Sequence, residues 1–309
     1  MDVLEVIDKT SWRLGLLRRK ALGCSPEIEW NEIVLAIMPE RLWHGRRSAL
    51  DRVPPCDRSV QIARRDGAMV LWRTRLGPIW GRETDGPAIL NLSHAILDER
   101  VYNRAPAGIG EDDVVIDAGA HLGAFTRFAL RHFEVKKLIA FEPDPGLAEC
   151  YRRTFEAEIR GGSVVLIEAA AWRRKERILL PLPPIRHVEG RRHARKDSVE
   201  VQAVTIDETL ARLGIGDIGY MKINVGGAER HVLAGATETL RRSRPRMTVC
   251  NSHQRDDVPV LREIVAAAQP EYEVIRRRDY DYYYCGEGCD GREYWELGLE
   301  PEDRPSFSA

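Results

Sequence analysis

One segment, residues 113–126, constrains the fold of this 309-residue chain more than any other. An apolar run ends in Asp117, and Gly119 and Gly123 follow before a helical pattern begins. A glycine at 119 lets the backbone turn sharply at the end of a strand, and a glycine at 123 lets the helix begin close to a ligand above the strand ends. Free N–H groups and the positive end of the helix dipole then face that ligand. The spacing D-x-G-x-x-x-G therefore predicts a ligand site, and it differs from the dinucleotide pattern G-x-G-x-x-G.

Strand-like and helical runs alternate around this segment, which predicts an α/β sheet with helical crossovers. We expect strands at Val114–Ala118, Leu138–Glu142, Val164–Glu168, Tyr220–Asn224, Met247–Asn251, Tyr272–Arg277 and Glu293–Leu297. We expect helices at 123–133, 145–159, 207–213, 228–242 and 256–268. No helical pattern separates the last two strands, so they should form an antiparallel hairpin. A seven-stranded, mostly parallel, Rossmann-like sheet that ends in this way resembles the class I methyltransferase fold.

An acid at the end of the next predicted strand strengthens the cofactor interpretation. Glu142 lies 25 positions after Asp117 (142 minus 117). In Rossmann proteins a carboxylate at this place accepts both ribose hydroxyls of an adenosine group, and Asp117 would face the amino-acid end of S-adenosylmethionine. The alternative is that Glu142 only caps the helix that opens near Pro145. The residues predicted to bind S-adenosylmethionine are Asp117, Gly119, His121, Gly123, Glu142, Pro143 and Ala170.

The chain divides into two predicted parts. Residues 1–95 should form an N-terminal α+β appendage, because helical apolar spacing precedes two prolines at 54–55 and short strand patterns follow between Ser59 and Trp80. They contain no chemical motif, and we expect them to cover the sheet or one side of a substrate cleft. Residues 96–309 should form the S-adenosylmethionine-binding class I methyltransferase domain.

Several strings in this second part resemble the FkbM-type S-adenosylmethionine-dependent methyltransferases. They are Val115–Gly123, Ala140–Pro143, Thr205–Glu208, Met221–Glu229 and Val232–Ala236. The resemblance covers residues 96–255 and leaves residues 1–95 out. It implies a methyltransferase that acts mainly on hydroxyl oxygens of sugars, polyketides and related natural products.

The chain departs from the family pattern where chemistry is expected. The family usually reads Lys-Ile-Asp-Val-Glu-Gly-Ala-Glu after its fourth strand, but this chain has Asn224 at the Asp and Gly226 at the first Glu. After the fifth strand it has Asn251 where a Glu is common, and His253 follows. Asparagine offers no charge to a hard cation and no usable basicity. We therefore expect a metal-independent mechanism and predict no metal ligands.

Three residues remain as catalytic candidates: Lys222, Asn224 and His253. Methyl transfer to a hydroxyl needs an aligned nucleophile and a base, and histidine is the side chain that titrates nearest neutral pH. His253 is predicted as the base, with Asn224 orienting the substrate or the amino-acid end of the cofactor; a structural histidine is the alternative. His121 is predicted to pack on the cofactor. An amine or carboxylate acceptor would need no strong base.

Other features leave alternatives open. A basic stretch at 186–196 is either a solvated loop or an anchor for an anionic substrate. The tyrosine-rich segment 280–291 is predicted to join the last two strands, where it forms an exposed hairpin tip or stacks on an acceptor. Cys285 and Cys289 are four apart, which indicates a local disulfide or free thiols rather than a zinc site. Glu229 opens a predicted helix, where an acid suits the dipole.

Charge and hydropathy limit the partners. Lys and Arg number 47 against 48 Asp and Glu, for a net charge of -1, so an RNA methyltransferase is disfavoured. No basic segment precedes an apolar run at the N-terminus, and no stretch reaches the ~20 apolar residues of a membrane span. We expect a cytoplasmic protein with a small-molecule acceptor, and a homodimer stays open. A non-methylating descendant that keeps the cofactor is the alternative activity, since three carboxylates are replaced.

Overall fold

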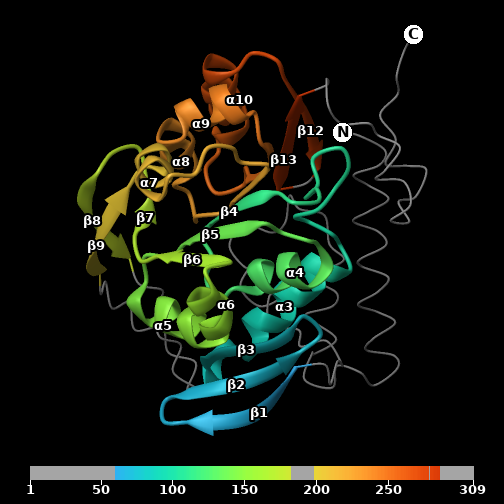
Figure 1. Cartoon of the computed structure of the whole chain (residues 1–309), viewed down its shortest axis with the longest axis vertical. Coiled ribbons are helices and arrows are strands. Elements are labelled where there is room, and N and C mark those ends of the chain that lie inside the picture. The colour runs from blue at the N-terminus through green and yellow to red at the C-terminus, as the bar shows by residue number, and fades with distance from the viewer. Residues whose placement is uncertain (1–59, 182–197, 278, 286–309) are drawn as a thin grey trace, which may run out of the picture.

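A seven-stranded α/β sheet forms the centre of the computed structural model, which describes residues 60–181, 198–277 and 279–285 (Figure 1). The strand order is β12-β13-β11-β10-β4-β5-β6. The strands are β4 (Val114–Ala118), β5 (Lys137–Phe141), β6 (Val164–Ile167), β10 (Tyr220–Ile223), β11 (Arg246–Cys250), β12 (Tyr272–Arg277) and β13 (Tyr280–Cys285). All pairings are parallel except those of β13, which runs antiparallel to β11 and β12. This order confirms the predicted fold class.

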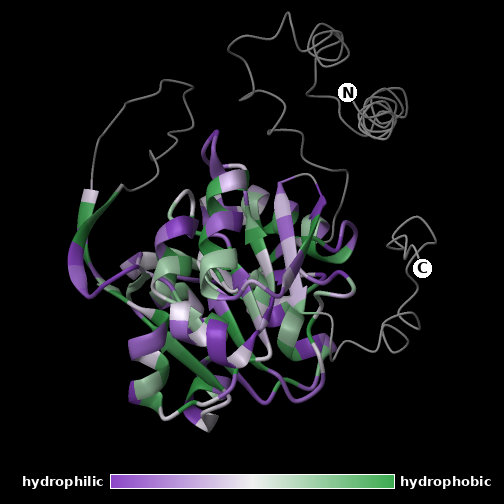
Figure 2. Ribbon diagram, turned by 90° about the horizontal axis from the view of Figure 1, so that it is seen from above, coloured by the Kyte–Doolittle hydropathy of each residue, from purple (hydrophilic) through white to green (hydrophobic). Residues whose placement is uncertain are grey.

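Helices cover both faces of the sheet (Figure 1). On one face lie α3 (Gly86–Leu97), α4 (Ala124–His132), α5 (Pro145–Thr154) and α6 (Glu156–Gly161); on the other lie α7 (Ile206–Leu213), α8 (Glu229–Ala234), α9 (Thr237–Ser243) and α10 (Asp257–Ala268). Every residue of β10 is buried, as expected for a strand covered on both sides. Hydrophobic segments run through the middle of the fold in Figure 2. No helix in the described ranges is long and apolar enough to cross a membrane.

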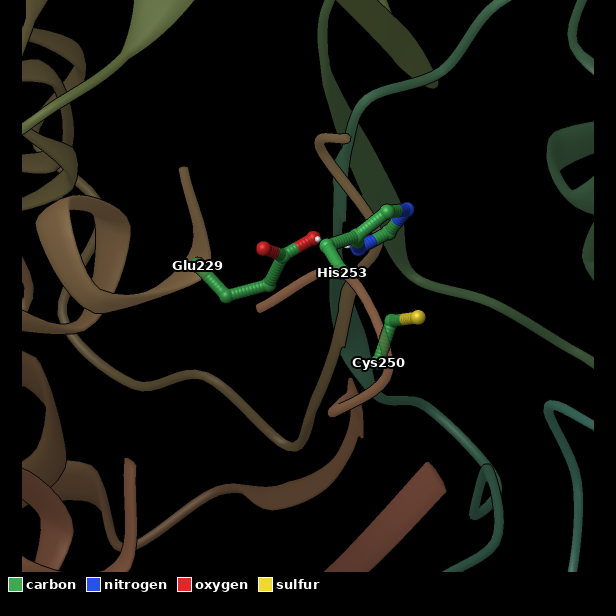
Figure 3. Close-up of side chains that lie close together, drawn as sticks. All are labelled: Glu229, Cys250 and His253. Atoms are coloured by element: carbon green, nitrogen blue, oxygen red, sulfur yellow. Dashed lines mark ion pairs between the residues drawn. The ribbon is translucent and has the colours of Figure 1, made fainter. Parts of the chain in front are cut away.

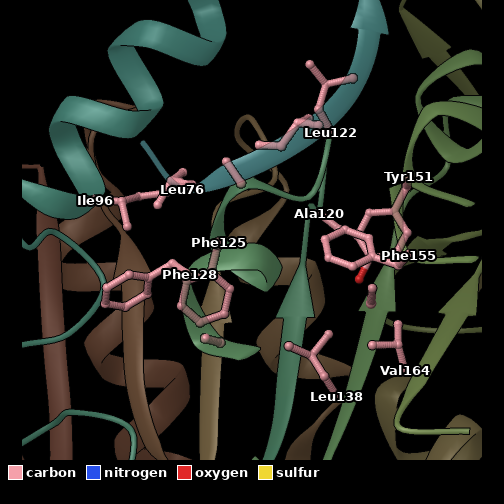
Figure 4. Packing of buried hydrophobic residues seen from close by; sticks show 14 of the residues in the cluster. Leu76, Ile96, Ala120, Leu122, Phe125, Phe128, Leu138, Tyr151, Phe155 and Val164 are labelled. Carbon is pink, nitrogen blue, oxygen red and sulfur yellow. The ribbon is translucent and has the colours of Figure 1, made fainter. Parts of the chain in front are cut away.

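The described part of the predicted appendage shares a hydrophobic core with the sheet. It contains an antiparallel meander, β1 (Gln61–Asp66), β2 (Met69–Thr74) and β3 (Gly77–Arg82), followed by the short helix η3 (Glu83–Asp85) and most of α3. Leu76 packs in one cluster with Leu122 and Phe155 (Figure 4), and the Trp80 N–H donates to Thr154 Oγ1 at 2.8 Å. The strands predicted between Ser59 and Trp80 are confirmed. The domain boundary at residue 95 stays a prediction.

The tyrosine-rich segment differs from its prediction. Residues 280–285 do not join two strands but form the strand β13, which pairs with β11 on one side and β12 on the other. Tyr282 and Tyr283 are each 2% exposed, and the Tyr282 hydroxyl donates to Val101 O at 2.9 Å. Tyrosine suits strands, and a buried phenol with a partner costs little. These two rings are therefore core residues that cannot stack on an acceptor. The expected strand Glu293–Leu297 lies outside the described residues, as does Cys289.

The connection from β6 to α7 also holds more structure than predicted. It contains β7 (Ala170–Ala171), β8 (Glu176–Pro181) and β9 (Ser198–Val204), which form a small sheet in the order β7-β9-β8. The basic stretch 186–196 lies outside the described residues. The helix expected at 228–242 is divided into α8 and α9 near Gly235. A side chain there would meet the Trp172 carbonyl oxygen at 1.9 Å, so the chain passes too close for any other residue.

Candidate functional site

The loop between β4 and α4 needs both of its predicted glycines. Gly119 and Gly123 have φ angles of +83° and +85°, in the left-handed region that glycine tolerates. A Cβ on Gly119 would lie 2.1 Å from the Asn224 carbonyl oxygen. A Cβ on Gly123 would lie 2.2 Å from the Phe155 ring, so this glycine makes room for a core side chain. Its predicted place beside the ligand stays a prediction.

A buried ion pair holds this loop from below. Lys222 Nζ donates to Asp117 Oδ1 at 2.9 Å, to Gly119 O at 2.6 Å and to Ala118 O at 3.3 Å. The other Asp117 oxygen accepts from Thr126 Oγ1 at 2.9 Å. Burial is the largest single effect on the pKa of Lys222 and lowers it, but the charge and hydrogen bond of Asp117, together with Tyr102 and Glu142, outweigh burial and the pKa is raised. The ammonium therefore stays charged with all three protons in use, which makes Lys222 a positioning residue for the loop.

Asp117 does not reach open space. Its side chain is 0% exposed and both of its oxygens have partners inside the protein. The predicted contact between Asp117 and the amino-acid end of the cofactor stays a prediction. In the structure Asp117 serves as the buried partner of Lys222 beneath the glycine loop.

Glu142 lies at the end of β5 beside the glycine loop, where a ribose acid was predicted. Its Oε2 accepts from the backbone N–H of His121 at 2.7 Å, and its Oε1 accepts from the backbone N–H of Asp144 at 2.9 Å. Asp144, not Glu142, caps α5, because its side chain accepts from the N–H groups of Gly146 and Leu147. Each oxygen of Glu142 keeps one further lone pair for a ligand hydroxyl. Burial raises the pKa of this carboxyl to about 7.

His121 supplies the clearest sign that a ligand belongs here. It occupies the left-handed region with φ of +53°, and its Nδ1 is buried with no hydrogen-bond partner among the described residues. Burial is the largest cause that lowers the pKa of this imidazole, so the ring is neutral. An unpartnered buried nitrogen beside an acid with spare lone pairs fits the adenosine half of S-adenosylmethionine. Pro143 and Ala170 follow the ends of β5 and β6, and their contact with the cofactor stays a prediction.

Asn224 lies in a group of hydroxyls at the end of β10. Its Nδ2 donates to Tyr102 OH at 2.8 Å and to Tyr280 OH at 3.4 Å. Lys222 Nζ lies 5.5 Å from the centre of the Tyr102 ring, so this group adjoins the glycine loop. Tyr102 was not predicted from the sequence, because it precedes β4 in a segment without a motif. Asn224 and Tyr280 are half-buried, so the group can receive polar groups of a ligand.

A second polar group lies between β11 and α8 (Figure 3). Glu229 is the first residue of α8, Cys250 is the last of β11, and His253 follows three positions later. Glu229 Oε1 lies 3.0 Å from His253 Nδ1, and one ligand atom from each of the three side chains lies within 4.8 Å of the others. Hydrogen bonds to Cys250 and then to Glu229 raise the pKa of His253 to about 10. We refer to these three residues as the Glu-Cys-His cluster.

Glu229 does more than suit a helix dipole. It is 0% exposed and accepts the N–H groups of Val225 and Gly227, each at 2.9 Å, so it also holds the loop before α8. His253 by contrast has 32% of its side chain exposed. Asn251 turns away from this site, since its Nδ2 donates to Asp281 Oδ1 at 2.8 Å. Cys250 was not predicted as a site residue from the sequence, although the spacing Cys-x-x-His was a signal for it.

Known proteins resemble this chain at the level of the family. Residues 117–282, more than half of the chain, match the family described as the Methyltransferase FkbM domain. Among curated relatives, the 31-O-demethyl-FK506 methyltransferase FkbM of Streptomyces tacrolimicus is 27% identical over 205 residues, which cover 57% of this chain and 78% of the relative. Methyltransferase 1 of Beauveria bassiana (strain ARSEF 2860) is 22% identical over 162 residues, or 45% of this chain.

This chain spans only part of some relatives. It covers 64% of the Beauveria protein. Among solved structures, methyltransferase FkbM from Methylobacillus flagellatus KT has a TM-score of 0.47 and 16% identity, with 65% of this chain and 53% of that chain covered. At this level of likeness the neighbouring structure says nothing about the acceptor.

Proposed function

Since the chain belongs to the FkbM methyltransferase family, we propose that it transfers a methyl group from S-adenosylmethionine to a hydroxyl of a small hydroxylated metabolite. A sugar or natural-product intermediate is the acceptor class that we favour, and the mechanism needs no metal ion. S-adenosylmethionine is the cofactor, and it supplies a methyl group activated by a sulfonium. The name of the Streptomyces relative, which specifies a 31-O-demethyl compound, supports transfer to oxygen.

The cofactor side of the site binds and orients. Glu142 would accept the ribose hydroxyls through its free lone pairs, and His121 would pack against the adenosine and gain a partner for Nδ1. The charged Lys222 keeps the glycine loop in place through Gly119 O. These groups are fixed before the ligand arrives, so little reorganisation opposes binding.

The pair of Glu229 and His253 is the observation that carries the proposal. A carboxylate at Nδ1 fixes the ring and selects the tautomer that carries the proton on Nδ1, so Nε2 of the neutral ring is free to accept a proton from the acceptor hydroxyl. The ring is exposed enough for an acceptor to reach it. Because the pKa is raised to about 10, only the neutral fraction of His253 acts as base, but that fraction is strongly basic. Asn224 and Tyr280 would hold other hydroxyls of the acceptor.

The test is methyl transfer by wild-type protein and by His253→Ala, with methyl-labelled S-adenosylmethionine and matched hydroxyl, amine and carboxylate acceptors. We expect hydroxyl acceptors to be used, and His253→Ala to lower kcat by about 10²–10⁴-fold with little change in cofactor affinity. His94→Ala is the matched control, because His94 also lies near carboxylates, 3.9 Å from Asp98, but on α3. Equal rates for wild type and His253→Ala would remove His253 as base. Cofactor binding with no transfer to any hydroxyl would favour the non-methylating alternative.

A further inference from the structure

The Glu-Cys-His cluster has a property that methyl transfer does not require. We propose that Glu229, Cys250 and His253 form a binding site for Zn²⁺. Zinc bound there blocks methyl transfer, because it coordinates Nδ1 of His253, the nitrogen whose hydrogen bond to Glu229 orients the base. The existence of the site is independent of the proposed function. Its effect on turnover rests on that function.

The donor set selects the metal. The three side chains offer one thiolate sulfur, one imidazole nitrogen and one carboxylate oxygen, all of which zinc accepts in proteins. Magnesium and calcium prefer oxygen ligands alone and would leave the sulfur unused. The replacements at positions 224, 226 and 251, which remove hard carboxylate ligands, therefore do not weaken this site. With these carboxylates replaced, the Glu-Cys-His cluster offers a stronger ligand set for a soft cation than for a hard one at this end of the sheet.

The geometry is close to that of a bound ion. Zinc ligands in a tetrahedral site lie about 3.5 Å from one another, given bond lengths of about 2.0–2.3 Å. The ligand atoms of Glu229 and His253 are 3.0 Å apart, and all three lie within 4.8 Å. A small rotation of the half-exposed His253 and of Cys250 would close the set. Three protein ligands leave a fourth position for water, as in zinc sites with an open coordination place.

Two of the ligands are already held in position. Glu229 is fixed by the backbone N–H groups of Val225 and Gly227, and its Oε1 directs a second lone pair at His253 Nδ1. Cys250 is fixed as the last residue of a central strand and is 4% exposed; its thiol contacts Ser252 Oγ at 3.6 Å and is a hydrogen-bond partner of His253.

Zinc binding and base catalysis exclude each other by geometry. The base function needs Nδ1–H donated to Glu229 so that Nε2 faces the acceptor, whereas a zinc ion takes both Nδ1 and Glu229 Oε1. The ring would then turn toward Cys250. We expect the zinc-loaded protein to bind S-adenosylmethionine normally, because Glu142 and the glycine loop lie at other strands.

The first test uses Co²⁺ as a spectroscopic stand-in for zinc in the chelator-treated full chain. A thiolate ligand gives a charge-transfer band in the near ultraviolet, which wild type should show and Cys250→Ser should lack. Cys285→Ser is the matched control, since Cys285 ends β13 outside the cluster. His253→Ala changes an exposed side chain and should weaken Zn²⁺ binding in calorimetry at least about tenfold, while Mg²⁺ should bind neither protein. A band that persists in Cys250→Ser, or equal zinc affinity in all variants, would overturn the site.

The second test measures methyl transfer against free Zn²⁺, with each variant compared with its own zinc-free rate. Wild type should lose activity over the zinc concentrations that fill the site, and Cys250→Ser should need at least about tenfold more zinc for the same loss. Inhibition that is equal in the two proteins would overturn the blocking effect. If no acceptor is methylated at all, the proposed function fails, but the cobalt band still decides whether the cluster binds metal.

Discussion

The two sides of the site differ in burial, although both lie at the carboxyl ends of neighbouring parallel strands. On the cofactor side, at β4 and β5, Asp117 and Glu142 are 0% and 5% exposed and their oxygens accept hydrogen bonds from the protein itself. Lys222 of β10 belongs to the same side, because its side chain pairs with Asp117. On the acceptor side, in the loops that follow β10 and β11, Asn224 is half-buried and His253 keeps 32% of its side chain exposed. The two cofactor-side carboxylates are thus part of the core, whereas Asn224 and His253 on the acceptor side lie nearer the surface. Substitutions on the cofactor side should therefore lower stability more than activity, and substitutions on the acceptor side should lower activity more than stability.

The largest stability effect should come from Lys222→Met. It leaves the fully buried Asp117 without its cation, and breaking a buried pair from one side costs about 3–5 kcal/mol. Urea unfolding followed by circular dichroism measures the loss. Removing both charges in Asp117→Asn/Lys222→Met should recover much of it, because no unpaired charge is left.

Lys175→Met is the matched control for this experiment, since Lys175 is exposed. It should change the free energy of unfolding by less than about 0.5 kcal/mol. If Lys222→Met were as mild as the control, the cofactor side would not be the rigid half of the site, and the contrast between the two sides would fail.

The two sides also differ in how well they can be predicted from the sequence. The glycine loop and Glu142 were found from the sequence because strand, turn and acid lie close together in the chain. The central strands were found because parallel strands buried on both faces are continuous apolar runs. The helix at 145–159 was predicted as one piece but forms α5 and α6, and no propensity in the sequence marks that break.

The acceptor side was predicted only in part, because its contacts join distant segments. Asn224 donates to Tyr102, which is 122 positions away in the chain, and no local sequence pattern predicts such a contact. His253 was selected as a lone histidine, but its partners Glu229 and Cys250 emerge only when β11 and α8 are folded together. The hairpin β12–β13 was expected with the wrong second strand, since the tyrosines of 280–285 were assigned to a connection.

Two glycines with the same backbone conformation allow a sharper comparison of the sides. Gly123→Ala adds a methyl 2.2 Å from the Phe155 ring, so overpacking of about 1–3 kcal/mol adds to left-handed strain of about 1–2 kcal/mol. Gly226→Ala on the acceptor side, with φ of +68°, has nothing within 4 Å and should cost the strain alone. Parallel denaturant titrations give the difference. If the two variants lost the same free energy of unfolding, the Phe155 side chain would move aside without a measurable packing cost.

The smallest effect should be the pH dependence of cofactor binding through Glu142. Burial raises the pKa of this carboxyl from 4.5 to about 7, and the ionised form is the better acceptor for ribose hydroxyls. Below pH 7 the proton must leave before the cofactor binds, so affinity should fall about tenfold between pH 8 and pH 6. Calorimetric titration of S-adenosylmethionine at these two pH values measures it.

Stability should respond to pH with the opposite sign, which separates binding from folding. A carboxyl with a raised pKa in the folded state stabilises the fold when protonated, and that contribution is lost as pH rises from 4.5 to about 7. Glu142→Gln should bind the cofactor about 1–2 kcal/mol more weakly, and both pH dependences should flatten. Glu168→Gln, at an exposed carboxyl just after β6, should keep both. A wild-type affinity that is constant from pH 6 to pH 8 would mean that the ribose does not contact this carboxylate.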